Sequence, residues 1–201
     1  MFLSYRFKIQ DTAVGVPIRG GGFNWTITES TDCFVWNPHQ WLNQGCVTVN
    51  NQKGTIGEPL NEKGGGVFAL EWDPINRHIR SYAFIPHNTV PENLRDAIRT
   101  ASDIDPWRRV RPDPSQWGLP YAYYPIGEGT RCPTDHFRNL HIIFNIALCG
   151  TVAGGLFFRD CPDLNKKYGS CDNYVAANTP AMNEVYWKIK GVYVYEREWS
   201  G

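Results

Sequence analysis

Two segments of the sequence alternate between apolar and other residues with a period of two, and this alternation constrains the fold more than any other feature. In residues 64–73, GGGVFALEWD, the side chains of Phe68, Leu70 and Trp72 fall on one face of an extended chain. Residues 78–86, HIRSYAFIP, repeat the alternation. A period of two is typical of half-buried β-strands, so we expect a strand in each segment.

A third segment, LHIIFNIALCGTVAG at residues 140–154, predicts a strand that ends at a cysteine and a loop of small residues. One face carries Asn145 among mixed residues, as in a strand that lines a ligand groove. An ordinary half-exposed strand has the same periodicity, so the pattern leaves both interpretations open. The other face is uninterruptedly apolar and is expected to lie between two sheets; it comprises Ile142, Phe144, Ile146 and Leu148.

The composition also favours β structure. The 201 residues include 8 Trp, 10 Tyr and 10 Phe beside 19 Gly and 14 Pro, which is typical of a β-rich, turn-rich protein. Residues 184–196, EVYWKIKGVYVYE, predict a last strand or strand pair with a bulge or bend at Gly191. Residues 91–102, PENLRDAIRTAS, predict one short surface helix that begins at Pro91. The predicted fold class is all-β, a two-sheet antiparallel β-sandwich.

Charge and cysteine content narrow the function classes. The 20 basic residues balance the 20 acidic ones, so we expect no nucleic-acid partner, and no apolar run is long enough to predict a membrane span. Six cysteines, an even number, favour an oxidising compartment, where the sequon at Asn24 could be glycosylated. The opening residues MFLSYRFKIQ lack an apolar segment of signal-peptide length. Cysteines of this kind without an export signal indicate either a mature domain or an incomplete gene model, and we favour the incomplete gene model.

Several segments, taken together and in order, resemble one family. They are GGGVFALEWD at 64–73, DPSQWGLP at 113–120, CPTDHF at 132–137, the segment at 140–154, and CDNYVAANTPAMNEVYWKIKGVYVYE at 171–196. From about Phe23 to Glu196 the chain is similar to the eukaryotic endo-β-1,3(4)-glucanases, or laminarinases, of glycoside hydrolase family 16.

The resemblance implies a β-jelly-roll sandwich whose concave sheet forms a glucan cleft. It assigns residues 23–201 to one such domain, expected to lack its N-terminal strands, and leaves residues 1–22 unmatched. It also implies a β-glucan ligand, no cofactor, a monomer, and an extracellular or cell-wall location.

The catalytic residues of the family are missing from this sequence. Retaining glycosidases hold two carboxyl groups about 5 Å apart, one as nucleophile and one as acid/base. The family supplies both from one strand, in the pattern Glu-x-Asp-x-x-Glu or its shorter form, just upstream of the segment that matches residues 26–33. Neither form of the pattern occurs in the chain, and Gln10 and Gly15 stand where the glutamates would fall. We therefore assign no catalytic residue and expect the chain as written to be inactive.

Two further positions depart from the family pattern. Thr28 stands where the group has a histidine, and Thr151-Val152 stands where its loop carries Asp-Trp. The family's tryptophan is a platform on which a pyranose ring stacks. By resemblance, the candidate substrate-binding positions are Trp117, as an exposed platform at the cleft rim, together with His136, Asn145 and Val152.

Other chemistries are less well supported. Glu196 and Glu198 share a strand face, but at the end of the chain they are better explained as solvated carboxylates. The cysteines and histidines between residues 132 and 149 could be drawn as a zinc site; they are Cys132, His136, His141 and Cys149. Their spacing matches no compact zinc pattern, so no metal site is expected. Disulfide use explains the cysteines better.

The disulfide pairing follows only in part from chain geometry, since six cysteines allow 15 connectivities. The short loops favour Cys161–Cys171 and Cys33–Cys46. Cys132–Cys149 is what remains, and it is the least certain pair.

Two hypotheses from different classes fit these observations. The first is a family 16 endo-β-1,3(4)-glucanase whose catalytic strand is missing from this chain or mistranslated in its first 22 residues. The alternative is a non-catalytic β-glucan-binding protein on the same fold that has lost its carboxylates.

Overall fold

The computed structural model describes residues 26–30, 34, 36–40, 47–50, 52–130 and 132–196. The predictions at Gln10, Gly15, Asn24, Cys33, Cys46 and Glu198 lie outside the described residues. The chain divides into two compact units. The first comprises Met1–Arg138 with Tyr193–Gly201, and the second comprises Asn139–Val192.

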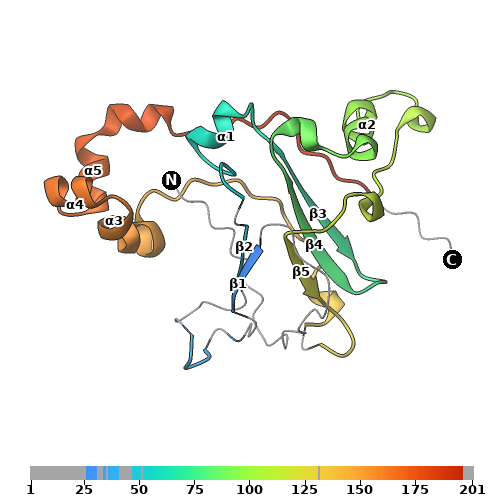
Figure 1. The fold of residues 1–201 in the computed structure, drawn as a ribbon, viewed down its shortest axis with the longest axis horizontal. Coiled ribbons are helices and arrows are strands. Elements are labelled where there is room, and N and C mark those ends of the chain that lie inside the picture. Colours follow the sequence, from blue (N-terminus) through green and yellow to red (C-terminus); the bar gives the residue numbers. More distant parts are fainter. Residues whose placement is uncertain are drawn as a thin grey trace. The chain divides into compact units, whose positions relative to one another are not determined.

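The first unit is built on antiparallel strands (Figure 1). A three-stranded sheet has the order β3-β4-β5, in which β3 is Val67–Asp73, β4 is His78–Phe84 and β5 is Ala122–Pro125. A second ladder pairs β1, Thr26–Ser30, with β2, Val47–Asn50. The predicted strands at 64–73 and 78–86 are confirmed, as is the antiparallel pairing.

The β3–β4 hairpin follows from its local sequence. Asp73 closes the turn, because its side chain accepts hydrogen bonds from the backbone N–H groups of Ile75 at 3.0 Å and Asn76 at 2.8 Å. Such an Asx turn is a common reason for aspartate at the start of a loop. The alternation also holds, since Phe68, Leu70 and Trp72 share the face predicted for them, where they are about half exposed.

Helix α2, Glu92–Thr100, confirms the predicted helix and packs on the other face of the sheet. Pro91 precedes its first turn, and Leu94 and Ala97 are its buried residues. Leu94 joins a core cluster with Tyr82, Val90 and Trp117. Burying a large apolar side chain stabilises a fold by about 1.5–3 kcal/mol, so this cluster attaches the helix to the sheet.

A second cluster occupies the opposite face of the same sheet. Ile79, Ile126 and Cys132 are buried there, with Tyr124 and Phe137 packed against them. Burial raises the pKa of the Cys132 thiol above its ordinary value, because an apolar environment disfavours the thiolate. Cys132 therefore acts as an apolar core residue in the first unit.

Short helices complete the described chain. The α-helices besides α2 are α1 Glu58–Glu62, α3 Gly155–Asp160, α4 Pro162–Tyr168 and α5 Cys171–Ala177, and a π-helical turn spans Gly150–Gly154. The 3₁₀ turns are His87–Thr89, Pro106–Arg108, Pro114–Gln116, Thr134–His136 and Thr179–Glu184. None of the helices in the described part of the chain has the length and apolar character needed to span a bilayer.

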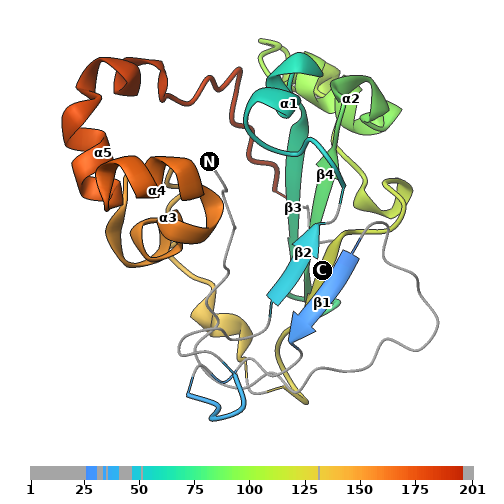
Figure 2. The ribbon, with the colours of Figure 1, turned by 60° about the vertical axis from the view of Figure 1, so that its left-hand side comes forward.

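The helices α3 to α5 of the second unit were not predicted (Figure 2). Their boundaries nevertheless have ordinary local causes. Pro162 occupies the first turn of α4, and Gly169 ends that helix in the left-handed conformation at φ 77°. Ser170 caps α5, because its hydroxyl accepts a hydrogen bond from the N–H of Asn173 at 3.2 Å.

The prediction of a buried strand at residues 140–148 is wrong. Ile142 is 63% exposed, Phe144 46% and Leu148 48%, and the segment pairs with no strand in the described residues. A strand is stable only when a neighbour takes up its backbone hydrogen bonds, which periodicity does not reveal.

The prediction of a last strand at residues 184–196 is also wrong for the described residues, since this segment joins no sheet. Within the second unit it does contact the segment at 140–148. The indole N–H of Trp187 donates to the backbone carbonyl of Asn145 at 3.0 Å, and the rings of Phe144 and Trp187 lie 6.2 Å apart.

The described disulfide joins Cys149 to Cys171, with 5.5 Å between their Cα atoms. The predicted pairs Cys161–Cys171 and Cys132–Cys149 are therefore wrong, and both Cys132 and Cys161 are free thiols. Cys161 precedes α4 and Cys171 follows it, and a seven-residue helix separates its ends by about 10 Å. A disulfide tolerates only about 7 Å between Cα atoms, and Cys171 meets this condition with Cys149.

Candidate functional site

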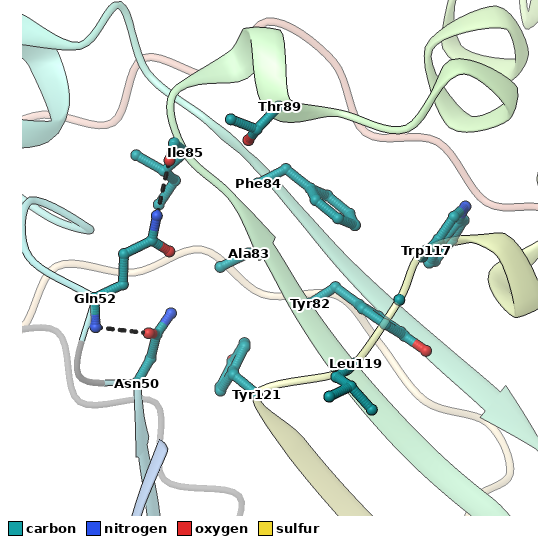
Figure 3. A pocket seen from close by; sticks show the side chains of 11 residues that line it. Asn50, Gln52, Tyr82, Ala83, Phe84, Ile85, Thr89, Trp117, Leu119 and Tyr121 are labelled. Atoms are coloured by element: carbon teal, nitrogen blue, oxygen red, sulfur yellow. Dashed lines mark hydrogen bonds between the residues drawn. The ribbon is translucent and has the colours of Figure 1, made fainter. Parts of the chain in front are cut away.

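A cavity of about 380 Å³ lies in the first unit, where β4 extends beyond the start of β5 (Figure 3). The β4–β5 ladder ends at the pair Ser81 and Ala122, so the last residues of β4 border the cavity instead of a strand. Its size falls within the range of small-molecule sites. The lining residues are Asn50, Gln52, Tyr82, Ala83, Phe84, Ile85, Thr89, Trp117, Gly118, Leu119 and Tyr121.

Two amides border one side of this cavity. The side-chain N–H of Gln52 donates to the carbonyl of Ile85 at 2.8 Å. This carbonyl lies beyond the end of the β4–β5 ladder, so Gln52 supplies the hydrogen bond that a neighbouring strand would otherwise make. The side chain of Asn50 accepts a hydrogen bond from the N–H of Gln52 at 3.0 Å. In the view of Figure 3 these amides lie on one side of β4, and the rings of Tyr82 and Phe84 lie on the other.

Three aromatic rings form the opposite wall. Trp117 meets Tyr82 edge to face at 5.2 Å between centroids and Phe84 at 6.2 Å, and Tyr82 stacks on Phe84 at 6.0 Å. The indole N–H of Trp117 donates to the side-chain oxygen of Asn93, on α2, at 2.8 Å. Trp117 is only 8% exposed, so the prediction that it forms an exposed platform is wrong. Its ring contacts Tyr82 and Phe84, and its N–H is bonded within the protein.

The hydroxyl of Tyr82 is the unusual polar group of the cavity. The residue is 2% exposed, and its oxygen has no hydrogen-bond partner in the described residues. Burial raises the pKa of the phenol above its ordinary value of 10.0, because the phenolate is disfavoured away from water. An unpaired buried hydroxyl costs about 1–3 kcal/mol, so this group lowers the stability of the folded chain.

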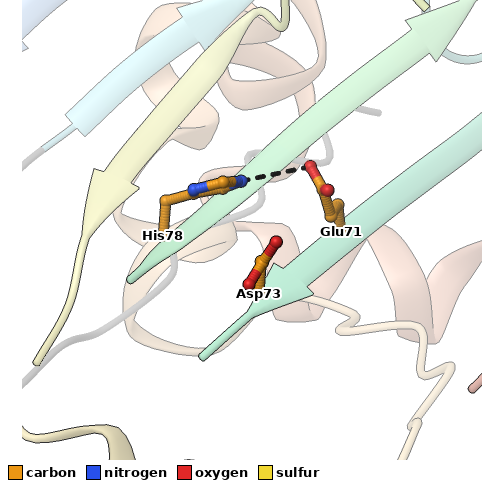
Figure 4. A group of neighbouring side chains, drawn as sticks. All are labelled: Glu71, Asp73 and His78. Carbon is orange, nitrogen blue, oxygen red and sulfur yellow. Dashed lines mark hydrogen bonds and ion pairs between the residues drawn. The ribbon is translucent and has the colours of Figure 1, made fainter. Parts of the chain in front are cut away.

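A second group of titratable side chains lies at the β3–β4 hairpin (Figure 4). The potential ligand atoms of Glu71, Asp73 and His78 lie within 4.8 Å of one another. Glu71 pairs with the Arg80 guanidinium, and its Oε2 lies 3.3 Å from His78 Nε2. The oxygens of Asp73 accept from the turn and from the Asn76 side chain, at 2.7 Å for the latter.

These contacts argue against a catalytic or metal site at the hairpin. The Arg80 guanidinium already neutralises Glu71, and a metal ion would have to compete with that fixed positive charge. Asp73 is 2% exposed, so a sugar ring could not approach its carboxylate. The cluster is best described as a structural ion-pair network that holds the hairpin.

The four predicted substrate-binding residues are divided between the two units. Trp117 and His136 belong to the first unit, where His136 is exposed on the turn Thr134–His136. Asn145 and Val152 belong to the second, where Asn145 is exposed and the backbone of Val152 lies in the π-helical turn. That turn replaces the open loop expected after Cys149.

The remaining predicted carboxylates do not form a pair either. Glu128 is exposed and forms an ion pair with Arg77 at 2.9 Å, and Glu196 is exposed at the end of the described chain. Cys149, considered as a zinc ligand, is bonded to Cys171. Sequence reasoning missed Tyr82 and Gln52 as cavity residues. The only signal available was the position of Tyr82 on an alternating strand.

The Tyr82 hydroxyl gives a first testable prediction. Tyr82→Phe removes an unpartnered polar atom, so the free energy of unfolding at neutral pH should stay within about 0.5 kcal/mol of the wild type or increase. Glucan affinity should stay within about twofold of the wild type, because the buried hydroxyl is out of reach of a sugar and forms no hydrogen bond to it. Urea denaturation and laminarin titration measure the two effects.

The same variant gives a pH test. Because the folded pKa of Tyr82 is raised, its contribution to stability is fully present below pH 10.0 and is lost as the pH rises through the folded pKa. Tyr82→Phe should therefore lose less stability than the wild type between pH 9 and pH 11. Equal losses in both proteins would contradict this assignment.

A cavity lined by rings, amides and a hydroxyl on an antiparallel β scaffold has the character of a site for a neutral, hydroxyl-rich ligand, as found in carbohydrate-active proteins. Residues 21–195 match a family model described as "XgeA-like, catalytic GH16 domain". The chain belongs to glycoside hydrolase family 16.

Relatives with curated descriptions agree with this assignment. The endo-1,3(4)-beta-glucanase of Arthroderma benhamiae is 35% identical over 185 residues, which cover 90% of this chain and 35% of the relative. The endo-1,3(4)-beta-glucanase xgeA of Emericella nidulans is 33% identical over 155 residues, 76% of this chain and 22% of the relative. A probable glycosidase of Schizosaccharomyces pombe is 31% identical over 169 residues, 83% of this chain and 34% of the relative. The chain thus spans about a third or less of the length of these relatives.

Proposed function

We propose that this chain forms part of an endo-β-1,3(4)-glucanase domain of family 16 and binds β-glucan. The observation that carries the proposal is the match of residues 21–195 to the catalytic domain of the family, together with relatives that are named endo-1,3(4)-beta-glucanases. The aromatic and amide lining of the cavity supports a neutral sugar ligand.

The proposal extends to architecture and location. In its complete form the domain, residues 23–201, is a two-sheet jelly-roll sandwich of the laminarinase type, with residues 1–22 outside it. The antiparallel sheets of the first unit support this architecture. The Cys149–Cys171 disulfide supports an extracellular or cell-wall location, because disulfides persist in oxidising compartments. We further propose that the protein is a monomer.

Hydrolysis of glucan requires catalytic carboxyl groups that this sequence does not supply. Hydrolysis by the family mechanism needs two carboxyl groups about 5 Å apart at an open cleft. The sequence lacks the Glu-x-Asp-x-x-Glu pattern, and Glu71 and the buried Asp73 are engaged at the hairpin. The chain as written therefore binds glucan without hydrolysing it.

This deficit also favours a second candidate function. This sequence lacks both catalytic glutamates and has Val152 where the family has a stacking tryptophan. Such a protein could act as a β-glucan-binding protein without enzymatic activity. The transcript upstream of the Met1 codon discriminates between the two candidates. An in-frame Glu-x-Asp-x-x-Glu segment there would establish the enzyme, and a transcript that starts at Met1 would establish the binding protein.

A further inference from the structure

The turn that follows α2 presents two apolar side chains almost completely to solvent. Trp107 is 96% exposed and Ile104 is 94% exposed. Both lie in residues 103–111, the light green segment that follows α2 in Figure 1, and Trp107 lies on the turn Pro106–Arg108. In the described part of the chain no other large apolar side chain is as exposed as these two.

Hydrogen bonds fix the backbone that carries them. The Asp103 side chain accepts from the N–H of Asp105 at 3.1 Å, and the Asp105 side chain accepts from the N–H of Trp107 at 3.0 Å. The N–H of Val110 donates to the Thr100 hydroxyl, at the end of α2, at 2.8 Å. The indole is therefore presented from a preorganised turn, which lowers the entropy cost of binding to it.

The same turn carries exposed hydrogen-bond donors. Arg108 and Arg109 are exposed next to it in the sequence, and Arg109 also donates through Nε to the carbonyl of Asp103 at 2.8 Å. The two aspartates turn a carboxylate oxygen toward backbone N–H groups. An exposed flat ring and exposed guanidinium groups on one turn offer the apolar face and the hydrogen-bond donors that a pyranose ring can use.

We propose that this turn, residues 103–111, is an accessory β-glucan-binding surface, separate from the cavity at β4. A glucosyl ring stacks on the indole of Trp107, and the neighbouring arginines donate hydrogen bonds to its hydroxyls. The proposal rests on the proposed function for the identity of the polysaccharide. The role of this surface is to hold the chain on insoluble glucan.

A membrane surface fits these observations less well. Two apolar side chains bury less apolar surface than a single myristoyl chain, which by itself gives only marginal membrane binding. Three arginines and two aspartates between residues 103 and 111 leave only one net positive charge. Attraction to anionic lipid is therefore weak.

The test measures retention of the 201-residue chain on particles of insoluble β-1,3-glucan. Trp107→Ala should weaken retention by about tenfold, which is the loss expected for one stacked ring. Trp107→Phe should restore part of it. Trp36→Ala is the matched control, because Trp36 is also exposed, at 64%, and this variant should bind as the wild type does. Anionic phospholipid vesicles serve as the competing probe.

Each outcome decides between the proposals. Equal retention of Trp107→Ala and the wild type, or no retention of the wild type, would overturn the accessory surface. Trp107-dependent binding to vesicles instead of glucan would replace it with a lipid surface. Trp107-dependent glucan retention, combined with no laminarin hydrolysis by a chain that carries the family's catalytic strand, would support the surface and overturn only the proposed enzymatic activity.

Discussion

The 201-residue chain is expected to release no reducing sugar from laminarin at a rate typical of the family. The same chain joined to the family's catalytic strand upstream of Phe23 should hydrolyse laminarin at least about 10²- to 10⁴-fold faster, which is the contribution of general acid catalysis alone. The nucleophile adds a covalent route on top of this. Contacts in the cavity at β4 cannot replace these groups, because they bind ground state and transition state about equally.

The matched control for this experiment is the joined chain with both glutamates of the added strand changed to glutamine. It keeps the added residues and should be as inactive as the unjoined chain. Comparable turnover by the unjoined chain would show that its own carboxylates act in catalysis. Glu71→Gln and Glu128→Gln would then be the first variants to measure, followed by the Glu196 and Glu198 pair.

Trp117→Ala should destabilise the first unit by about 3–5 kcal/mol, the usual cost of removing a large aromatic side chain from a core. The ring contacts Tyr82 and Phe84, and its N–H bonds to Asn93. Its loss therefore opens a void between α2 and the sheet and leaves the partly buried amide oxygen of Asn93 with one partner fewer. The midpoint of urea denaturation measures the change.

Two other variants make this result specific. Trp107→Ala removes the same chemical group from an exposed site, so its free energy of unfolding should stay within about 0.5 kcal/mol of the wild type. Trp117→Phe keeps the apolar body but loses the N–H donor, and it should fall between wild type and Trp117→Ala. If Trp117→Ala unfolds at the same urea concentration as Trp107→Ala, Trp117 is not a core residue.

The parts of the fold that the sequence predicted are those with local causes. The alternation in residues 67–84 and the proline start of α2 depend on neighbouring residues, and both elements form as expected. The segment at 140–148 has an equally clear alternation, but burial of Ile142 depends on a partner strand from elsewhere in the chain. Periodicity does not report whether that partner is present.

The helices of the second unit were missed although their signals are in the sequence. Pro162, Gly169 and Ser170 stand at positions typical of helix ends. The short spacing between Cys161 and Cys171 was instead interpreted as a disulfide loop. Cys171 bonds to Cys149 instead, so the shorter sequence separation did not identify its partner.

The candidate site was the least predictable part. Trp117 lies in a loop beside prolines, where exposure is the usual expectation, but Asn93 and the ring of Tyr82 bury it. Gln52 reaches Ile85 across 33 residues of sequence, and no local pattern encodes such a contact. Only the family resemblance pointed to a sugar ligand, and the match over residues 21–195 confirms the family.

The Cys149–Cys171 bond also affects how this protein would respond to proteases. The two cysteines are 22 residues apart and enclose the π-helical turn, α3 and α4. A protease that cuts once inside this loop would separate the chain into two pieces that stay covalently joined. The nicked protein would therefore run as one band on a non-reducing gel and as two bands after reduction. On such a gel a single cut would pass unnoticed unless the disulfide were reduced first.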